Sequence, residues 1–223
     1  MYKRQEEALT TIVGFEEARA GIYSVYLGLT GGSYVLAPEV QADAFNAVAD
    51  FSNKYGELHR WTFESTNSTV ETIWANCYAA IGRANFFIDG VGKIDENPEI
   101  ELTEIQKQQI NVYEGEAYFT WAYCYFYLAT LFCRDYDVAT AANTPGLPLQ
   151  VKYEPKLPAT QYPGRSSLED TYKQILEDLE EAEERIETAK NGIADYDRYI
   201  NGAYVTVNTA PKNCGNYITV DVV

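Results

Sequence analysis

The spacing of hydrophobic residues along the chain predicts four amphipathic helices. Apolar side chains recur at steps of three and four residues from Phe15 to Leu29, a period typical of one buried helix face. Gly31-Gly32 is expected to end this first helix. The same period returns in stretches at 68–90, 103–133 and 166–187. Four such helices favour an all-α architecture.

Each of the three later helices opens with a pattern typical of a capping box. In this motif a Ser or Thr side chain accepts a backbone N–H three residues on, and a Glu or Gln there reaches back to the cap. The predicted pairs are Ser68 with Glu71, Thr103 with Gln106, and Ser166 with Glu169.

The third and fourth helices differ in the way they are expected to be buried. The third is aromatic on several faces near its C-terminal end, at Tyr123, Phe126 and Tyr127, so that end should be covered on more than one side. The fourth has one apolar stripe opposite a row of glutamates. We interpret this row as a solvated face rather than a catalytic carboxylate pair, because nothing nearby would shift a pKa. Its members are Glu177, Glu180, Glu181, Glu184 and Glu187.

Two connections, 31–66 and 134–165, are too long to be simple turns. The second holds five of the eight prolines, so we expect an extended segment that packs over the helices. Long ordered loops on a rigid scaffold are where binding residues tend to lie.

The two ends of the chain differ in character from residues 8–190, which we expect to form the helical domain. Residues 1–7 are interpreted as a non-native or disordered leader, and any signal peptide or anchor is expected to lie outside this chain. In the divergent or truncated tail, 191–223, the stretches 204–207 and 217–220 alternate like short strands. The predicted fold is therefore all-α with long ordered loops and an irregular or short β tail.

Charge narrows the possible partners. The chain has 17 basic and 33 acidic residues, and its net charge is −16. Such a surface repels nucleic acid and anionic lipid headgroups, whereas a neutral ligand such as a sugar is not penalised. Nineteen tyrosines and three tryptophans supply flat rings that stack on sugars or pack helices.

Metal binding and nucleophilic catalysis lack the residues they require. The four cysteines have no Cys-x-x-Cys spacing, and His59 is the single histidine. We therefore expect no metal site and no cofactor, and interpret the cysteines as buried free thiols.

Four motifs occur in order between residues 8 and 187. The helical stretches carry Phe15-Glu-Glu-Ala18 with Gly21-Ile-Tyr23, then Trp61-Thr-Phe63 with Trp74 and Arg83-Ala-Asn85, then Gly115-Glu116-Ala117, then Arg165-Ser-Ser167 with Tyr172. Together they resemble the SusD/RagB family, the nutrient-binding outer-membrane lipoproteins of Bacteroidetes. One departure is Tyr118 and Trp121, which stand where the family often has basic residues.

Glu116 lies on the apolar side of its predicted helix, so a buried carboxylate there needs a partner. Arg83 and Arg19 are the two candidates. We assign Glu116 a structural role rather than that of a general acid, because no second positioned carboxylate or base accompanies it. Arg83, Trp74 and Tyr172 are likewise expected to be structural.

The resemblance implies a scaffold of tetratricopeptide-like helix pairs and a role in nutrient uptake. It implies a carbohydrate-binding lipoprotein at the extracellular face of the outer membrane, which delivers an oligosaccharide or other neutral nutrient to a SusC-like TonB-dependent transporter during polysaccharide utilisation. It implies neither enzyme activity nor a nucleic-acid partner.

The candidate ligand-binding residues are Asp43, Tyr55, Arg60 and Trp61 in the first long connection. An aromatic face with neighbouring hydrogen-bonding groups is the usual means of holding a sugar, although a Trp just before a helix more often packs against it. Two alternatives stay open. The helices could be a docking domain for the transporter, with ligand binding in a further C-terminal part, or the chain could belong to a glycoside hydrolase, although no carboxylate pair of suitable spacing stands out.

Overall fold

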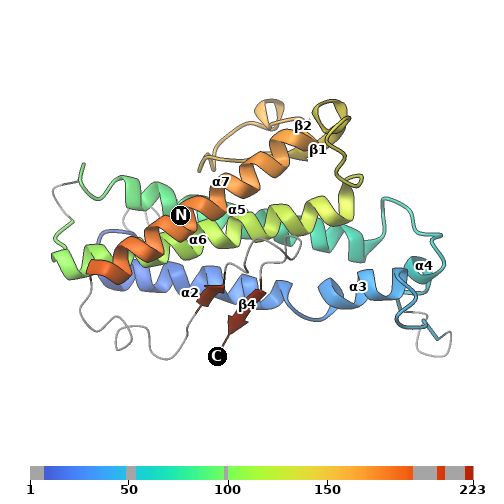
Figure 1. Cartoon of the computed structure of the whole chain (residues 1–223), viewed down its shortest axis with the longest axis horizontal. Helices are drawn as coiled ribbons and strands as arrows, with labels where there is room; N and C mark the ends of the chain where they lie inside the picture. The colour runs from blue at the N-terminus through green and yellow to red at the C-terminus, as the bar shows by residue number, and fades with distance from the viewer. Residues whose placement is uncertain (1–7, 49–53, 98–99, 193–204, 209–218, 223) are drawn as a thin grey trace.

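Four long helices run along the same axis of the molecule. The computed structural model describes residues 8–48, 54–97, 100–192, 205–208 and 219–222. The long helices are α2 (Ile12–Leu29), α5 (Ser68–Gly92), α6 (Glu104–Phe132) and α7 (Leu168–Gly192). Helix α6 contacts the other three and is the centre of the bundle (Figure 1). The predicted all-α class is confirmed.

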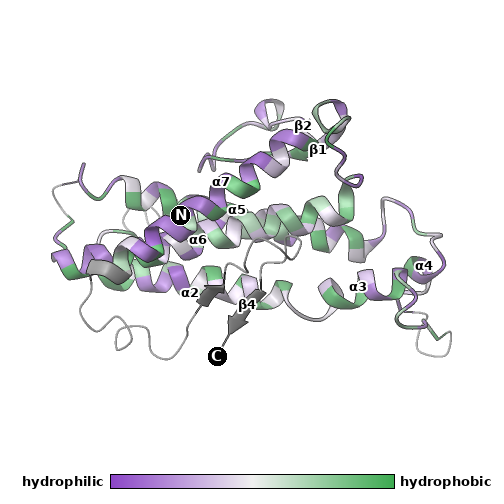
Figure 2. Cartoon of the chain, in the orientation of Figure 1, coloured by the Kyte–Doolittle hydropathy of each residue, from purple (hydrophilic) through white to green (hydrophobic). Residues whose placement is uncertain are grey.

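The hydrophobic core gathers around α6. Phe15 of α2 meets Phe87 of α5 edge-to-face, with ring centroids 5.7 Å apart, and both side chains are fully buried. Tyr125 and Leu128 of α6 are also fully buried. Figure 2 shows the hydrophobic residues along the C-terminal half of α6 and the mainly hydrophilic α7. The expectation that this half of α6 is covered on several sides is confirmed, although Phe126 remains half exposed.

Helix α7 is buried along one stripe only. Leu168, Ile175 and Ala182 face the core, and the five glutamates of the opposite face are exposed. Their interpretation as a solvated face is confirmed. The buried stripe also includes Asp178, which the hydrophobic pattern did not identify.

The capping box of α6 is formed as predicted. The Thr103 hydroxyl accepts the backbone N–H of Gln106 at 3.3 Å, and the Gln106 side chain accepts the backbone N–H of Thr103 at 2.9 Å. The helix therefore begins at the residue that the sequence indicates.

The predicted caps of α5 and α7 are each wrong by one residue. Asn67, not Ser68, caps α5, because its side-chain oxygen accepts the N–H groups of Thr69 at 3.1 Å and Val70 at 3.4 Å. Ser167, not Ser166, caps α7 by accepting the N–H of Asp170 at 3.0 Å. In the second case the residues before the helix belong to a strand, which delays its start.

The first long connection contains a helix that the sequence analysis missed, α3 (Ser33–Gln41), and the short α4 (Gly56–His59). Pro38 lies inside α3 and has no N–H, so the carbonyl of Tyr34 loses its helical partner. The hydroxyl of Tyr127 in α6 donates to that carbonyl instead. The Asn76 amide of α5 also donates to the Tyr34 hydroxyl. These bonds fix α3 to the bundle.

The proline-rich connection lies over the helices as expected. It contains 3-10 turns at Ala141–Asn143 and Ala159–Gln161 and two short antiparallel strands, β1 (Pro145–Pro148) and β2 (Arg165–Ser167). Gly146 is required where β1 approaches α7, because a Cβ there would lie 2.2 Å from the Thr171 hydroxyl.

The tail contains a second antiparallel pair, β3 (Val205–Asn208) with β4 (Thr219–Val222). The predicted strands were placed one or two residues too early. The predictions for residues 1–7 and for the remainder of the tail fall outside the described residues. Within the described part of the chain, no helix combines the length and apolar character that a membrane span requires.

Candidate functional site

The sequence-predicted ligand residues lie together at one end of the bundle. The Trp61 corner, as we name it, consists of the end of α3, helix α4 and residues 60–63, and is at the right-hand end of Figure 1. Leu58 of α4 is fully buried and anchors it. His59 Nδ1 donates to the carbonyl of Val40 at 3.2 Å, which ties α4 to α3. The corner is therefore held by buried side chains and not only by its loop backbone.

Three residues of this corner have a left-handed backbone. Among the described residues, the non-glycine positions with positive φ are Asp43 at 58°, Tyr55 at 61° and Trp61 at 54°. The left-handed region costs an L-residue about 1–2 kcal/mol, and such conformations are found preferentially at ligand-binding sites. All three are candidates that the sequence singled out for their side-chain chemistry, which says nothing about φ.

Trp61 occupies the position after α4 that glycine usually takes. The Thr62 N–H donates to the carbonyl of Glu57 at 3.0 Å and the Trp61 N–H to that of Leu58 at 3.1 Å, the two bonds of a Schellman motif. The residue is 66% exposed, and its ring lies 6.2 Å from that of Phe63 between centroids. The sequence left open that this tryptophan packs against the helix that follows it. The side chain does not do so, because most of its ring remains in solvent.

The polar candidates differ in how exposed they are. The Asp43 side chain is 84% exposed, and its carboxylate lies 3.9 Å from His59 Nδ1. Arg60 is exposed beside Trp61. Tyr55 is half-buried, and its hydroxyl is 2.8 Å from that of Ser33. Tyr55 therefore belongs to the frame of the corner, whereas Asp43, Arg60 and Trp61 form its solvent-facing surface.

The surface of the corner carries the exposed Trp61 side chain, the exposed Arg60 next to it in sequence, and the Asp43 carboxylate 3.9 Å from His59. Such a set suits a ligand with an apolar face and hydroxyl groups. The described residues contain no group of three or more His, Cys, Asp or Glu side chains that could hold a metal ion. Cys77 and Cys124 are buried free thiols, as predicted, and Cys133 is partly buried.

Comparison with protein families supplies the decisive observation. Residues 21–193 match the SusD-like family, described as "Starch-binding associating with outer membrane". The chain belongs to the SusD-like family.

The similar proteins also carry SusD names. The chain is 30% identical over 81 residues to SusD-like protein P2 of Formosa agariphila, a match that covers 36% of this chain and 14% of that protein. Its fold resembles a SusD superfamily protein of Bacteroides thetaiotaomicron, with a TM-score of 0.58 and 18% identity, over 78% of this chain and 37% of that one. A SusD superfamily protein of Bacteroides vulgatus gives a TM-score of 0.52 and 19% identity, over 77% and 37%. The chain thus spans little more than a third of these solved relatives.

In this SusD-like chain, Glu116 takes part in a buried ion pair. Of its two candidate partners, Arg19 makes the pair, through Nε at 2.5 Å and a second nitrogen at 2.7 Å. Arg19 also lies over the Tyr113 ring, 4.4 Å from its centroid. Arg83 instead donates to the carbonyl of Gly21 at 2.9 Å, which joins α5 to α2. The carboxylate is thus fully occupied by a bidentate contact within the scaffold.

The two aromatic residues expected to be structural pack between elements. Trp74 meets Phe132 edge-to-face at 5.0 Å, and Tyr172 meets Tyr136 at 4.9 Å. Phe45 lies just beyond Asp43 in the candidate connection and was not among the predicted ligand residues; it is 54% exposed. Its aromatic side chain within the same connection is the sequence signal that could have added it.

Proposed function

We propose that the protein is a glycan- or nutrient-binding surface lipoprotein component that presents its ligand to a SusC-like TonB-dependent transporter, and that the Trp61 corner contacts the ligand. The observation that carries the proposal is the exposed indole of Trp61 in a left-handed position. Family membership supports a saccharide as the ligand. Lipid anchoring at the extracellular face of the outer membrane, and the absence of catalysis, belong to the same proposal.

The physical basis is a shallow site that holds a sugar without chemical reaction. The indole offers its face to the C–H groups of a sugar ring, and Asp43 and Arg60 supply an acceptor and donors for hydroxyl groups. The hydrogen bonds among Ser33, Tyr55, His59 and Val40 keep the corner in place before binding. Less conformational freedom is then lost when the ligand arrives.

Isothermal titration of the full chain against a panel of oligosaccharides tests the proposal. We expect at least one to bind, and Trp61→Ala to weaken that binding about fivefold or more, because stacking on an aromatic ring contributes about 1 kcal/mol or more. Tyr162→Ala is the matched control, since Tyr162 is 63% exposed but lies outside the corner. Equal loss in both variants, or no binding to any glycan, would contradict the proposal.

A transporter-docking role for the helices makes a different prediction. The solved relatives extend well beyond the part that this chain matches, so ligand contacts in such a protein need not lie in the helices. Capture of the transporter by the helical chain, together with glycan affinity that is unchanged by Trp61→Ala, would favour docking. Release of reducing sugar by a pure preparation would instead favour a glycoside hydrolase.

A further inference from the structure

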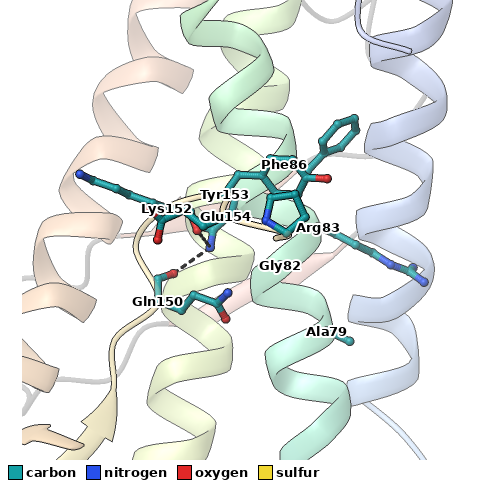
Figure 3. Close-up of a pocket in the computed structure, with 10 residues that line it drawn as sticks. Ala79, Gly82, Arg83, Phe86, Gln150, Lys152, Tyr153 and Glu154 are labelled. Atoms are coloured by element: carbon teal, nitrogen blue, oxygen red, sulfur yellow. Dashed lines mark hydrogen bonds between the residues drawn. The ribbon is translucent and has the colours of Figure 1, made fainter. Parts of the chain in front are cut away.

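A groove on the side of α5 is separate from the Trp61 corner. It consists of two cavities, of about 280 and 510 Å³, between α5 and the segment 150–161. Phe86 and Tyr153 line both cavities, so the two are adjacent at this aromatic pair. Figure 3 shows the smaller cavity. We name the two cavities together the α5 groove. Its size is that of pockets that take small ligands.

The wall opposite α5 is held in place by side chains of the bundle. The Tyr78 hydroxyl donates to the carbonyl of Pro148 at 2.8 Å, and the Gln150 N–H donates to the Tyr125 hydroxyl at 2.7 Å. Asn85 Nδ2 donates to the carbonyls of Gln150 at 2.8 Å and Lys152 at 3.2 Å. Because three side chains fix this extended segment, the groove exists before any ligand binds.

Asn85 also leaves one acceptor unused. The residue is 3% exposed and lines the smaller cavity, and its Oδ1 has no hydrogen-bond partner among the described residues. A buried acceptor without a donor costs about 1–3 kcal/mol, and buried polar atoms are nearly always paired. Because Oδ1 itself has less than 1 Å² of accessible surface, the Asn85 amide shapes the wall of this cavity rather than facing into it.

Gly82 leaves space in the same cavity. It lies in the middle of α5, where glycine costs about 0.5–1 kcal/mol relative to alanine. A Cβ at this position would meet nothing within 4 Å, so packing against the rest of the chain does not require glycine here. A longer side chain would instead extend toward the cavity and reduce its volume.

The remaining lining groups indicate the class of ligand. The rings of Phe86 and Tyr153 are half-buried, with centroids 5.1 Å apart and planes at 61°. Asp89, paired with Lys93 at 2.5 Å, and Glu154 add charged acceptors and donors along the larger cavity. Aromatic surface combined with charged hydrogen-bonding groups suits a saccharide, which has apolar C–H faces and hydroxyls that both donate and accept.

We propose that the α5 groove is a second saccharide-binding site, independent of the Trp61 corner. This inference rests on the proposed glycan-binding function and adds a second binding location. A chain with two sites binds two segments of a long glycan at once, and the second contact then benefits from high effective concentration.

The test uses Gly82→Tyr, which fills the smaller cavity, and Gly82→Ala, which adds the same Cβ without filling it. Both are made in a Trp61→Ala background and titrated with maltohexaose, xylohexaose and hexagalacturonate. We expect Trp61→Ala to retain binding of at least one probe with a stoichiometry of one. Gly82→Ala should preserve that binding, and Gly82→Tyr should weaken it at least tenfold. Circular dichroism checks folding, and Tyr153→Ala replaces Gly82→Tyr if the latter fails to fold.

The outcomes separate this inference from the proposed function. If Trp61→Ala abolishes all saccharide binding, the groove is not a saccharide site and the corner proposal stands. If both cavity variants bind as the Trp61→Ala chain does, the remaining binding does not take place in the groove and the groove inference is wrong. If the unaltered chain binds neither the probes nor any member of the wider oligosaccharide panel, the proposed function and the α5 groove inference are both wrong.

Discussion

Replacing Trp61 by glycine and by alanine isolates the backbone conformation at the corner. Neither variant has an indole, so the loss of its contacts with Phe63 and with solvent is common to both. The two differ at the position after α4, where the backbone has φ of 54°. Alanine keeps the cost of a left-handed L-residue, about 1–2 kcal/mol, whereas glycine removes it.

Glycine also loses more conformational entropy than alanine on folding. This lowers the stability advantage of the glycine variant by about 0.5–1 kcal/mol. We therefore expect Trp61→Gly to be more stable than Trp61→Ala by about 0.5–1 kcal/mol. For a chain of this size that corresponds to a shift in Tm of about 1–4 °C. Urea denaturation followed by circular dichroism measures it, and the tryptophans that remain give a second signal by fluorescence.

The reasoning is refuted if Trp61→Ala is as stable as Trp61→Gly, because Trp61 would then not be left-handed in solution. Saccharide titration adds the functional half of the experiment. Both variants should lose affinity to the same extent, since the indole face and not the backbone makes the proposed contact. If the glycine variant is stable but does not bind saccharide, the strained backbone position serves to present the indole ring of Trp61.

The remaining predictions concern the scaffold. Arg19→Met should lower the free energy of unfolding by about 3 kcal/mol, because Glu116, only 8% exposed, would be left unpaired. Urea denaturation midpoints measure this loss. An additional Glu116→Leu change should restore much of the lost stability. Burial raises the pKa of Asp178 to about 7. The folded state therefore holds this proton more tightly than the unfolded chain, and stability should fall as pH rises from about 4 to about 7. Asp178→Asn should weaken that dependence, and an unchanged profile in the variant would rule out Asp178 as its source. Asn67→Ala should lower the free energy of unfolding by about 1 kcal/mol, because α5 loses its cap, whereas Ser68→Ala should change it very little. If Ser68→Ala were the more destabilising of the two, Ser68 would be the cap, as the sequence suggested.

The long helices could be predicted from sequence because their periodic burial depends on local spacing. Thr103 illustrates this, since its cap involves only residues within one turn. Ser166 failed as a cap because the strand pairing with β1 is a long-range contact. Helix α3 was missed because it contains Pro38, and the Tyr34 carbonyl left without a helical partner accepts from the Tyr127 hydroxyl of α6. That bond joins residues 93 positions apart, so local spacing does not indicate it.

The candidate site likewise has some features that the sequence could predict and others that it could not. The exposed Trp61 and Asp43 could be named from residue type and position, because aromatic and acidic side chains in a long connection suggest ligand contact. Their left-handed backbones could not be anticipated, since non-glycine residues seldom adopt them. The α5 groove was invisible in the sequence because α5 and the segment 150–161 come together only through the tertiary bonds of Tyr78, Asn85 and Tyr125.

The proline in α3 has a consequence for the order of assembly. A nine-residue helix is too short to persist alone in water, and this one also has a carbonyl that no N–H of its own can reach. Its helical form therefore depends on the docked tyrosine of α6. A peptide of residues 33–41 should be unstructured in isolation, and the Trp61 corner, which rests on that helix, should take shape only after the central bundle has formed.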